Sequence, residues 1–267
     1  MIDMQKILET LESNPDNFSE VVKCGREELI PCIQKISDTY NEASQTKGSG
    51  SADYASFMLI AKSINDLMTG LHLANHGYIA QSYSVLRPIL ETIDLLKLFE
   101  LKPEYADKWA GGGKKAWDEL SPSKVRDLLG DAKFDPIYSH FCEAGAHSTF
   151  QSGSGMTGVK IEGTKRTVSI WIGGVHNEFI EPQLIFLYGF IFFLTFKLYS
   201  TTLALLHKKQ GKDLLHTFPE LIAHFENFIN LSKDKLEKRG IDTTELSEFL
   251  TASKSFAIFD DASSTTQ

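Results

Sequence analysis

An arginine and a glutamate lie one helical turn apart in a mainly apolar run, Ser-Val-Leu-Arg87-Pro-Ile-Leu-Glu91. At a spacing of i, i+4 their side chains lie on the same side of a helix and can form an ion pair. A guanidinium group also binds carboxylates and phosphates through paired hydrogen bonds. The pattern therefore supports two interpretations. The pair either braces two packed helices, or Arg87 binds an anionic group that Glu91 helps to orient.

A second group of polar residues follows about fifty residues later, in Tyr138-Ser-His-Phe-Cys-Glu-Ala-Gly-Ala-His147. The spacing i, i+3, i+7 places His140, Glu143 and His147 within an arc of about 60° on one helix. Such ligands can hold a divalent metal ion, but the spacing is not the H-E-x-x-H pattern of metalloproteases. We therefore expect buried or capping histidines and no metal. Acid–base chemistry by His147, with Tyr138 or Glu143 near it, is a separate alternative.

The periodicity of apolar residues predicts the helices that carry these groups. We expect helices at 2–13, 18–46, 53–75, 79–101, 122–129, 134–146, 177–209, 213–238 and 243–256, with one or two short helices over 104–118. Two short alternating runs around Gly163-Thr-Lys-Arg166 predict a β-hairpin over 159–172. The predicted fold class is all-α, an irregular helical bundle with one small β-hairpin insertion.

No internal repeat and no change of composition divides the chain into parts. We therefore expect a single helical domain over 1–259, with 53–150 and 177–209 as its core. The polar residues 260–267 are expected to form a disordered tail.

The net charge and the cysteine spacing argue against some classes of protein. The formal charge of −8 over 267 residues argues against a protein built mainly to bind nucleic acid, which is usually basic. Cys24, Cys32 and Cys142 lack C-x-x-C spacing, so we expect reduced thiols in a cytoplasmic protein rather than disulfides or a zinc site. Nothing in the sequence calls for a cofactor.

One segment, 184–206, is apolar and long enough to cross a bilayer. Lys197 lies near its middle, and the polar run Tyr199-Ser-Thr-Thr202 follows. A lysine near the centre of a lone membrane span is energetically costly. We therefore expect a central core helix that is apolar nearly all round, and no membrane association.

The run Gly77-Tyr-Ile-Ala-Gln-Ser-Tyr-Ser-Val-Leu-Arg87-Pro-Ile-Leu-Glu91, followed by a helix ending in Gly145-Ala-His-Ser148, resembles a family of bacterial helical proteins. An Arg-x-x-x-Glu helix followed by a Tyr/His helix is the signature of this family, which is related to the HEPN-like proteins of toxin–antitoxin and phage-defence systems. The likeness covers about residues 53–150. It implies an interior polar cluster of Arg87, Glu91, Tyr138 and His147. Catalytic HEPN ribonucleases use an Arg-x4–6-His motif, and no histidine follows Arg87 within six residues.

These observations lead to one functional expectation and one alternative. We expect a homodimeric HEPN-like accessory or ligand-sensing protein without enzymatic activity, linked to phage defence or toxin–antitoxin systems. Its site would bind a small anionic ligand through Arg87, Glu91, Tyr138, His140, Glu143 and His147. The alternative is an enzyme, a nuclease or phosphate-handling hydrolase that uses His147, Arg87 and Glu91.

Overall fold

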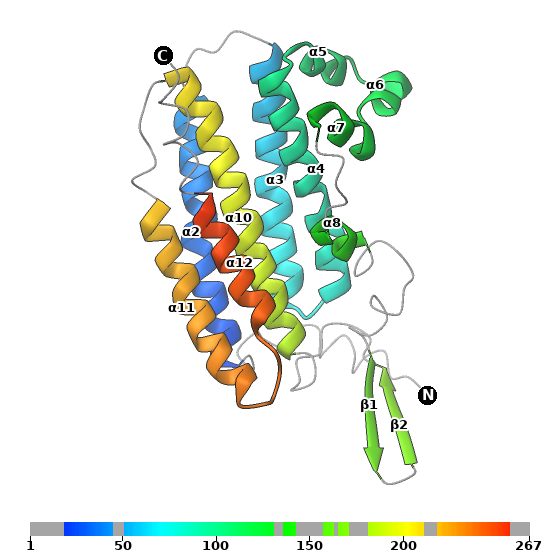
Figure 1. Cartoon of the computed structure of the whole chain (residues 1–267), viewed down its shortest axis with the longest axis vertical. Helices are drawn as coiled ribbons and strands as arrows, with labels where there is room; N and C mark the ends of the chain where they lie inside the picture. The colour runs from blue at the N-terminus through cyan, green and yellow to red at the C-terminus, as the bar shows by residue number, and fades with distance from the viewer. Residues whose placement is uncertain are drawn as a thin grey trace.

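Ten helices make up almost all of the structure in the part of the chain described by the computed structural model, residues 19–44, 51–130, 136–142, 157–162, 165–170, 181–210 and 218–256. The longer helices are α2 (Glu20–Ser44), α3 (Ser51–Asn75), α4 (Ile79–Leu101), α10 (Glu181–Gln210), α11 (Phe218–Glu237) and α12 (Thr244–Ser255). The shorter ones, beside α3 and α4 in Figure 1, are α5 (Glu104–Gly111), α6 (Gly113–Glu119), α7 (Pro122–Leu129) and α8 (Pro136–Phe141). The predicted all-α helical bundle is confirmed.

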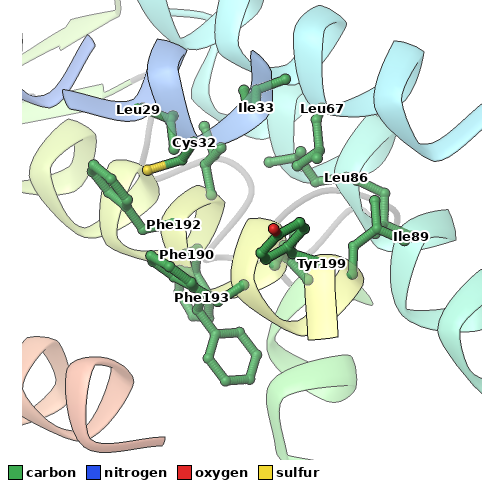
Figure 2. Packing of buried hydrophobic residues seen from close by; sticks show 14 of the residues in the cluster. Leu29, Cys32, Ile33, Leu67, Leu86, Ile89, Phe190, Phe192, Phe193 and Tyr199 are labelled. Carbon is green, nitrogen blue, oxygen red and sulfur yellow. The ribbon is translucent and has the colours of Figure 1, made fainter. Parts of the chain in front are cut away.

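Helix α10 lies at the centre of this bundle, and most of its described side chains are buried. Figure 2 shows its phenylalanines among the core residues. Phe192 stacks on Phe225 of α11 with ring centroids 4.7 Å apart, and Phe190 lies 4.4 Å from Phe249 of α12. Aromatic packing of this kind buries a large apolar area, so α10 holds the two C-terminal helices against the rest of the core.

The same helix is the one membrane-span candidate among the described residues. Over Glu181–Leu205 it is long and apolar enough to cross a bilayer, but 78% of its most apolar window is buried inside the bundle. The core helix of a soluble protein meets the same test of length and composition. The core position of α10 is thus as expected, while the absence of membrane association stays a prediction.

Helix α4, with the predicted bounds, packs closely on α3 at a glycine. A Cβ atom at Gly70 would lie 2.5 Å from Leu86 Cδ2, so only glycine allows this approach. Ser82 Oγ donates a buried hydrogen bond of 2.8 Å to the Gly70 carbonyl oxygen. The apolar side of α4 thus faces α3 and α10. Its polar side, with Arg87 and Glu91, faces the shorter helices.

The shorter helices follow α4 and fold back onto it. Gly112 and Gly113, at the junction of α5 and α6, both have positive φ, 60° and 78°. Glycine adopts a positive φ without steric cost. The stretch 104–118, where one or two short helices were expected, thus holds two. Leu98 of α4 packs with Leu120 and Val125 in a small apolar cluster that holds α7 against α4.

Two strands, β1 (Thr157–Glu162) and β2 (Lys165–Ile170), pair antiparallel, with Thr157 opposite Ile170 and Glu162 opposite Lys165. Figure 1 shows this pair extending away from the helices. The predicted role of 159–172 as an insertion stays a prediction. The predicted helix at 2–13 and the predicted tail at 260–267 lie outside the described residues, and the single-domain organisation is likewise untested.

Candidate functional site

A cleft of about 580 Å³ opens between α4 and the shorter helices. Its polar wall includes Arg87, Glu91 and Asp94 of α4 and Tyr138 of α8. The rest of the described lining is mainly apolar: Leu95 of α4, then Trp109, Ala116, Leu120, Pro122 and Val125 from the segments that follow α4, with Gly112, Gly113 and Ser121. A concave site with a few polar groups set in an apolar surface is the usual form of a small-molecule site.

The helical repeat of α4 places its polar residues on one wall of the cleft. Arg87, Glu91 and Asp94 follow each other at i, i+4 and i+7, which is one face of an α-helix. The buried residues Ile89 and Leu96 lie on the opposite face, in the core. The closeness of α3 and α4 therefore fixes where these three charged side chains can point.

Tyr138 of α8 contacts the polar residues of α4 on this wall. Its hydroxyl donates a hydrogen bond of 2.9 Å to Glu91 Oε1, which also lies 3.5 Å from Arg87 Nε. Burial and the adjacent Glu91 carboxylate raise the pKa of the Tyr138 hydroxyl well above its ordinary value. The phenol therefore stays protonated at neutral pH, and it acts as a hydrogen-bond donor rather than as a base.

A second ion pair lies next to the first. Arg126 of α7 has its Nε 3.7 Å from Asp94 Oδ2. The guanidinium carbon of Arg126 also lies 4.1 Å from the centre of the Tyr138 ring, a cation–π contact. Tyr138 thus joins both ion pairs, through its hydroxyl to Glu91 and through its ring to Arg126.

Among the described residues that line the cleft, Arg87 is the cation. Burial alone would lower its pKa, but the Glu91 carboxylate and the contact with Cys142 raise it above the ordinary value. Its ion-pair distance of 3.5 Å is longer than a good charge-assisted hydrogen bond. Among the described residues, its buried Nε atom has no hydrogen-bond partner, and Nη1 lies 4.0 Å from Cys142 Sγ. The guanidinium has five N–H donors and the side chain is partly exposed, so donors other than the buried Nε can reach a ligand.

His140 lies on a different side of α8 from the cleft. Its ring stacks on Phe190 at 5.0 Å and meets the Tyr83 ring edge-on at 5.4 Å, so it packs into the aromatic core. Glu143 and His147 lie outside the described residues, so the polar set predicted on that helix is not tested. Within the described ranges, the structure groups no three His, Cys, Asp or Glu side chains that could hold a metal ion.

Of the predicted site residues, the structure thus brings together Arg87, Glu91 and Tyr138. It adds Asp94 and Arg126, which sequence reasoning missed. Asp94 could have been found because it continues the polar face of α4 three residues after Glu91. Arg126 gives no such signal, since only the packing of α7 on α4 brings it here.

No family model, no curated protein and no solved structure matches this chain. The HEPN-like relationship therefore stays a prediction, and the function must be argued from the site itself.

The described lining of the cleft carries groups that can bind a ligand. Arg87 stays charged, and Tyr138 stays protonated, near neutral pH. In the described lining, Ser121 is the one serine, threonine or cysteine that could act as a nucleophile, and no histidine lies there beside it. A serine needs an adjacent base to act as a nucleophile. The groups present can hold a ligand by charge, hydrogen bonds and apolar contact.

Proposed function

We propose that this chain is a ligand-binding protein without enzymatic activity, and that the cleft beside α4 holds a small molecule with an anionic group. One observation carries the proposal: Arg87 and Glu91 of α4 and Tyr138, which lies 47 positions after Glu91, converge on one cleft of about 580 Å³. The volume falls within the usual range for small-molecule sites. The mixed lining favours a ligand that has both a charged group and an apolar part.

Arg87 is the residue that would bind the anionic group. It lines the cleft, and its side chain is 31% exposed. Among the described residues, its guanidinium is held by one long ion pair and a weak contact to sulfur. A carboxylate or phosphate offers the paired acceptors that match a guanidinium. Glu91 and Tyr138 would hold Arg87 in place by fixing the carboxylate that faces it.

A simple aromatic acid tests this proposal. We expect 3-phenylpropionate to bind the full chain in isothermal titration calorimetry, and Arg87→Gln to weaken its affinity by about tenfold or more, since hydrogen bonds to charged groups contribute about 1.5–3 kcal/mol. The matched control is Lys62→Gln. It also breaks an i, i+4 ion pair, but on an exposed part of α3 away from the cleft. Equal binding by Arg87→Gln and the wild type would contradict the proposal.

The cellular setting is a further part of the proposal. We infer a cytoplasmic, homodimeric, HEPN-like accessory or sensing protein tied to phage defence or toxin–antitoxin systems, with the β1–β2 pair as an insertion in the bundle. The sequence resemblance supports the family and its setting. Exposed apolar side chains on α3, Tyr54 and Met58, are consistent with pairing through helix faces. The enzymatic alternative depends on His147, which lies outside the described residues, and we do not propose it.

A further inference from the structure

Two histidines lie together where α3 ends. His72 is in the last turn of this helix, and His76 directly follows its final residue, Asn75. We propose that the rings of His72 and His76 together bind one divalent transition-metal ion of the copper, nickel and zinc group. The site shares no residue with the described lining of the cleft beside α4, so it does not depend on the proposed function.

The spacing of the two histidines brings their rings together. At i, i+4 two side chains lie one helical turn apart on the same face, and histidine pairs with this spacing bind zinc in helical metal sites. The ring centres of His72 and His76 lie 4.3 Å apart, with 44° between the ring planes. A metal ion lies about 2.0–2.1 Å from an imidazole nitrogen, so the centres of two ligating rings lie within about 6 Å of each other. The observed separation meets this limit.

A hydrogen bond fixes which nitrogen of His76 is free to bind a metal ion. Its Nδ1 lies 2.8 Å from the carbonyl oxygen of His72, and a carbonyl oxygen can only accept. Nδ1 therefore carries the proton, and in the neutral ring the lone pair is on Nε2. Metal-binding histidines usually donate their second ring nitrogen to a carbonyl or carboxylate in this way. Within the described part of the chain neither ring has a further hydrogen bond, so no such partner need be displaced.

The backbone that carries His76 is held in a defined turn. Gly77 has a φ of 73°, and its N–H bonds to the Ala74 carbonyl oxygen at 2.9 Å. The Tyr78 N–H bonds to the Leu73 carbonyl oxygen at 2.9 Å. These two bonds form a Schellman motif, in which a glycine ends a helix. The two rings therefore start from a fixed backbone, which reduces the entropy lost when a ligand binds.

The position at the end of a helix favours a cation. The last carbonyl groups of a helix carry partial negative charge, and this charge stabilises a positive ion within the last turn. His72 is exposed and His76 is half-buried, so an ion can reach both rings without unfolding α3.

The type of ligand selects the class of metal. Imidazole nitrogens suit Zn²⁺, Ni²⁺ and Cu²⁺, and Cu²⁺ binds most tightly in this series. Mg²⁺ and Ca²⁺ take oxygen ligands instead. Two protein ligands leave the remaining coordination positions to water. We therefore expect binding of Zn²⁺, tighter binding of Cu²⁺, and no binding of Mg²⁺ at this pair.

Calorimetric titration of the full chain with Zn²⁺ tests the site. The chain has eight histidines, so the measured quantity is the equivalent that each variant loses relative to the wild type. We expect His72→Gln and His76→Gln each to weaken one Zn²⁺ equivalent by about tenfold or more, since even the loss of a residue that only orients a metal ligand costs that much. His72→Gln leaves the bond of the His76 ring to the backbone in place, and circular dichroism confirms that each variant is folded.

Two controls make the assignment specific. The double variant should lose no more Zn²⁺ than either single variant, because two ligands of one ion act as a unit. The matched control is His224→Gln, which removes a half-buried ring that already pairs with Glu28 of α2. It should bind Zn²⁺ as the wild type does.

Several results would overturn the proposed metal site. One is a wild type that binds no Zn²⁺, or a His72→Gln variant that binds as many equivalents as the wild type with the same affinities. Another is a double variant that loses two equivalents where each single variant loses one, which would mean that the two rings do not share an ion. An equal loss in His224→Gln would show that the effect is not specific to the end of α3. None of these results bears on the binding of 3-phenylpropionate, so the proposed function is tested separately.

Discussion

Replacing Tyr138 by phenylalanine removes the hydroxyl that joins α8 to α4 and leaves the ring in place. In the wild type this hydroxyl donates a hydrogen bond of 2.9 Å to Glu91 Oε1, and the ring lies under the guanidinium of Arg126. The change therefore isolates one contact. It preserves the cation–π contact and nearly all of the apolar packing.

The expected magnitude follows from the type of bond and its exposure. A hydrogen bond to a charged acceptor contributes about 1.5–3 kcal/mol when it is buried. Here the Glu91 side chain is 26% exposed, so water can partly replace the lost donor. We expect Tyr138→Phe to lower the free energy of unfolding by about 1–2 kcal/mol. In a chain of this size each kcal/mol lowers Tm by about 2–4 °C, so Tm should fall by about 2–8 °C.

Thermal unfolding followed by circular dichroism measures this change. Tyr54→Phe is the matched control, because Tyr54 is 66% exposed and its substitution should change stability by no more than about 0.5 kcal/mol. A double-mutant cycle with Glu91→Gln then assigns the effect to the pair, with a coupling energy of about 1 kcal/mol expected. Two results would refute the reasoning that Tyr138 holds Glu91. One is a Tm of Tyr138→Phe equal to that of the wild type. The other is a double mutant whose loss of unfolding free energy is the plain sum of the losses of Tyr138→Phe and Glu91→Gln.

Two further predictions concern the core. Gly70→Ala should destabilise the protein by about 1–3 kcal/mol in chemical unfolding, because the new Cβ would overlap Leu86, while Gly111→Ala, where nothing lies within 4 Å, should be nearly neutral. Equal effects of the two substitutions would contradict the close approach of α3 and α4. Burial, with the nearby Glu28 carboxylate, raises the pKa of the Cys32 thiol to about 12, so one of the three thiols should stay unlabelled by a disulfide reagent in the native protein from pH 7 to 9. Cys32→Ser should abolish that unlabelled thiol, and labelling of all three native thiols at pH 8 would show that Cys32 is not buried.

The helical part of the fold could be predicted from the sequence because its helices are long and their apolar residues recur regularly. The bounds 79–101 follow from the apolar stripe of α4 and from Pro103, and they agree with the structure. The central place of α10 follows from its nearly continuous apolar composition. The contact of Gly70 with Leu86 was not accessible, because it depends on how α3 and α4 are placed in space.

The site was only partly accessible from sequence for the same reason. Arg87 and Glu91 could be paired because a helical repeat fixes their separation. Tyr138 was identified from its place in the second polar segment, but its bond to Glu91 joins residues 47 positions apart. The contacts of His140 with the rings of Tyr83 and Phe190 could not be predicted from the sequence, because these two rings come from other helices. Periodicity describes one element at a time and does not specify what packs against it.

The most direct test of the central claim, that the cleft beside α4 is a ligand site built on Arg87, is a crystal structure of the full chain soaked with 3-phenylpropionate. We predict a carboxylate within about 3.2 Å of a guanidinium nitrogen of Arg87, the distance of an ordinary hydrogen bond, and a phenyl ring against Trp109 and Leu120. An empty cleft at a concentration that saturates binding in solution, or the acid bound elsewhere on the protein, would contradict the claim.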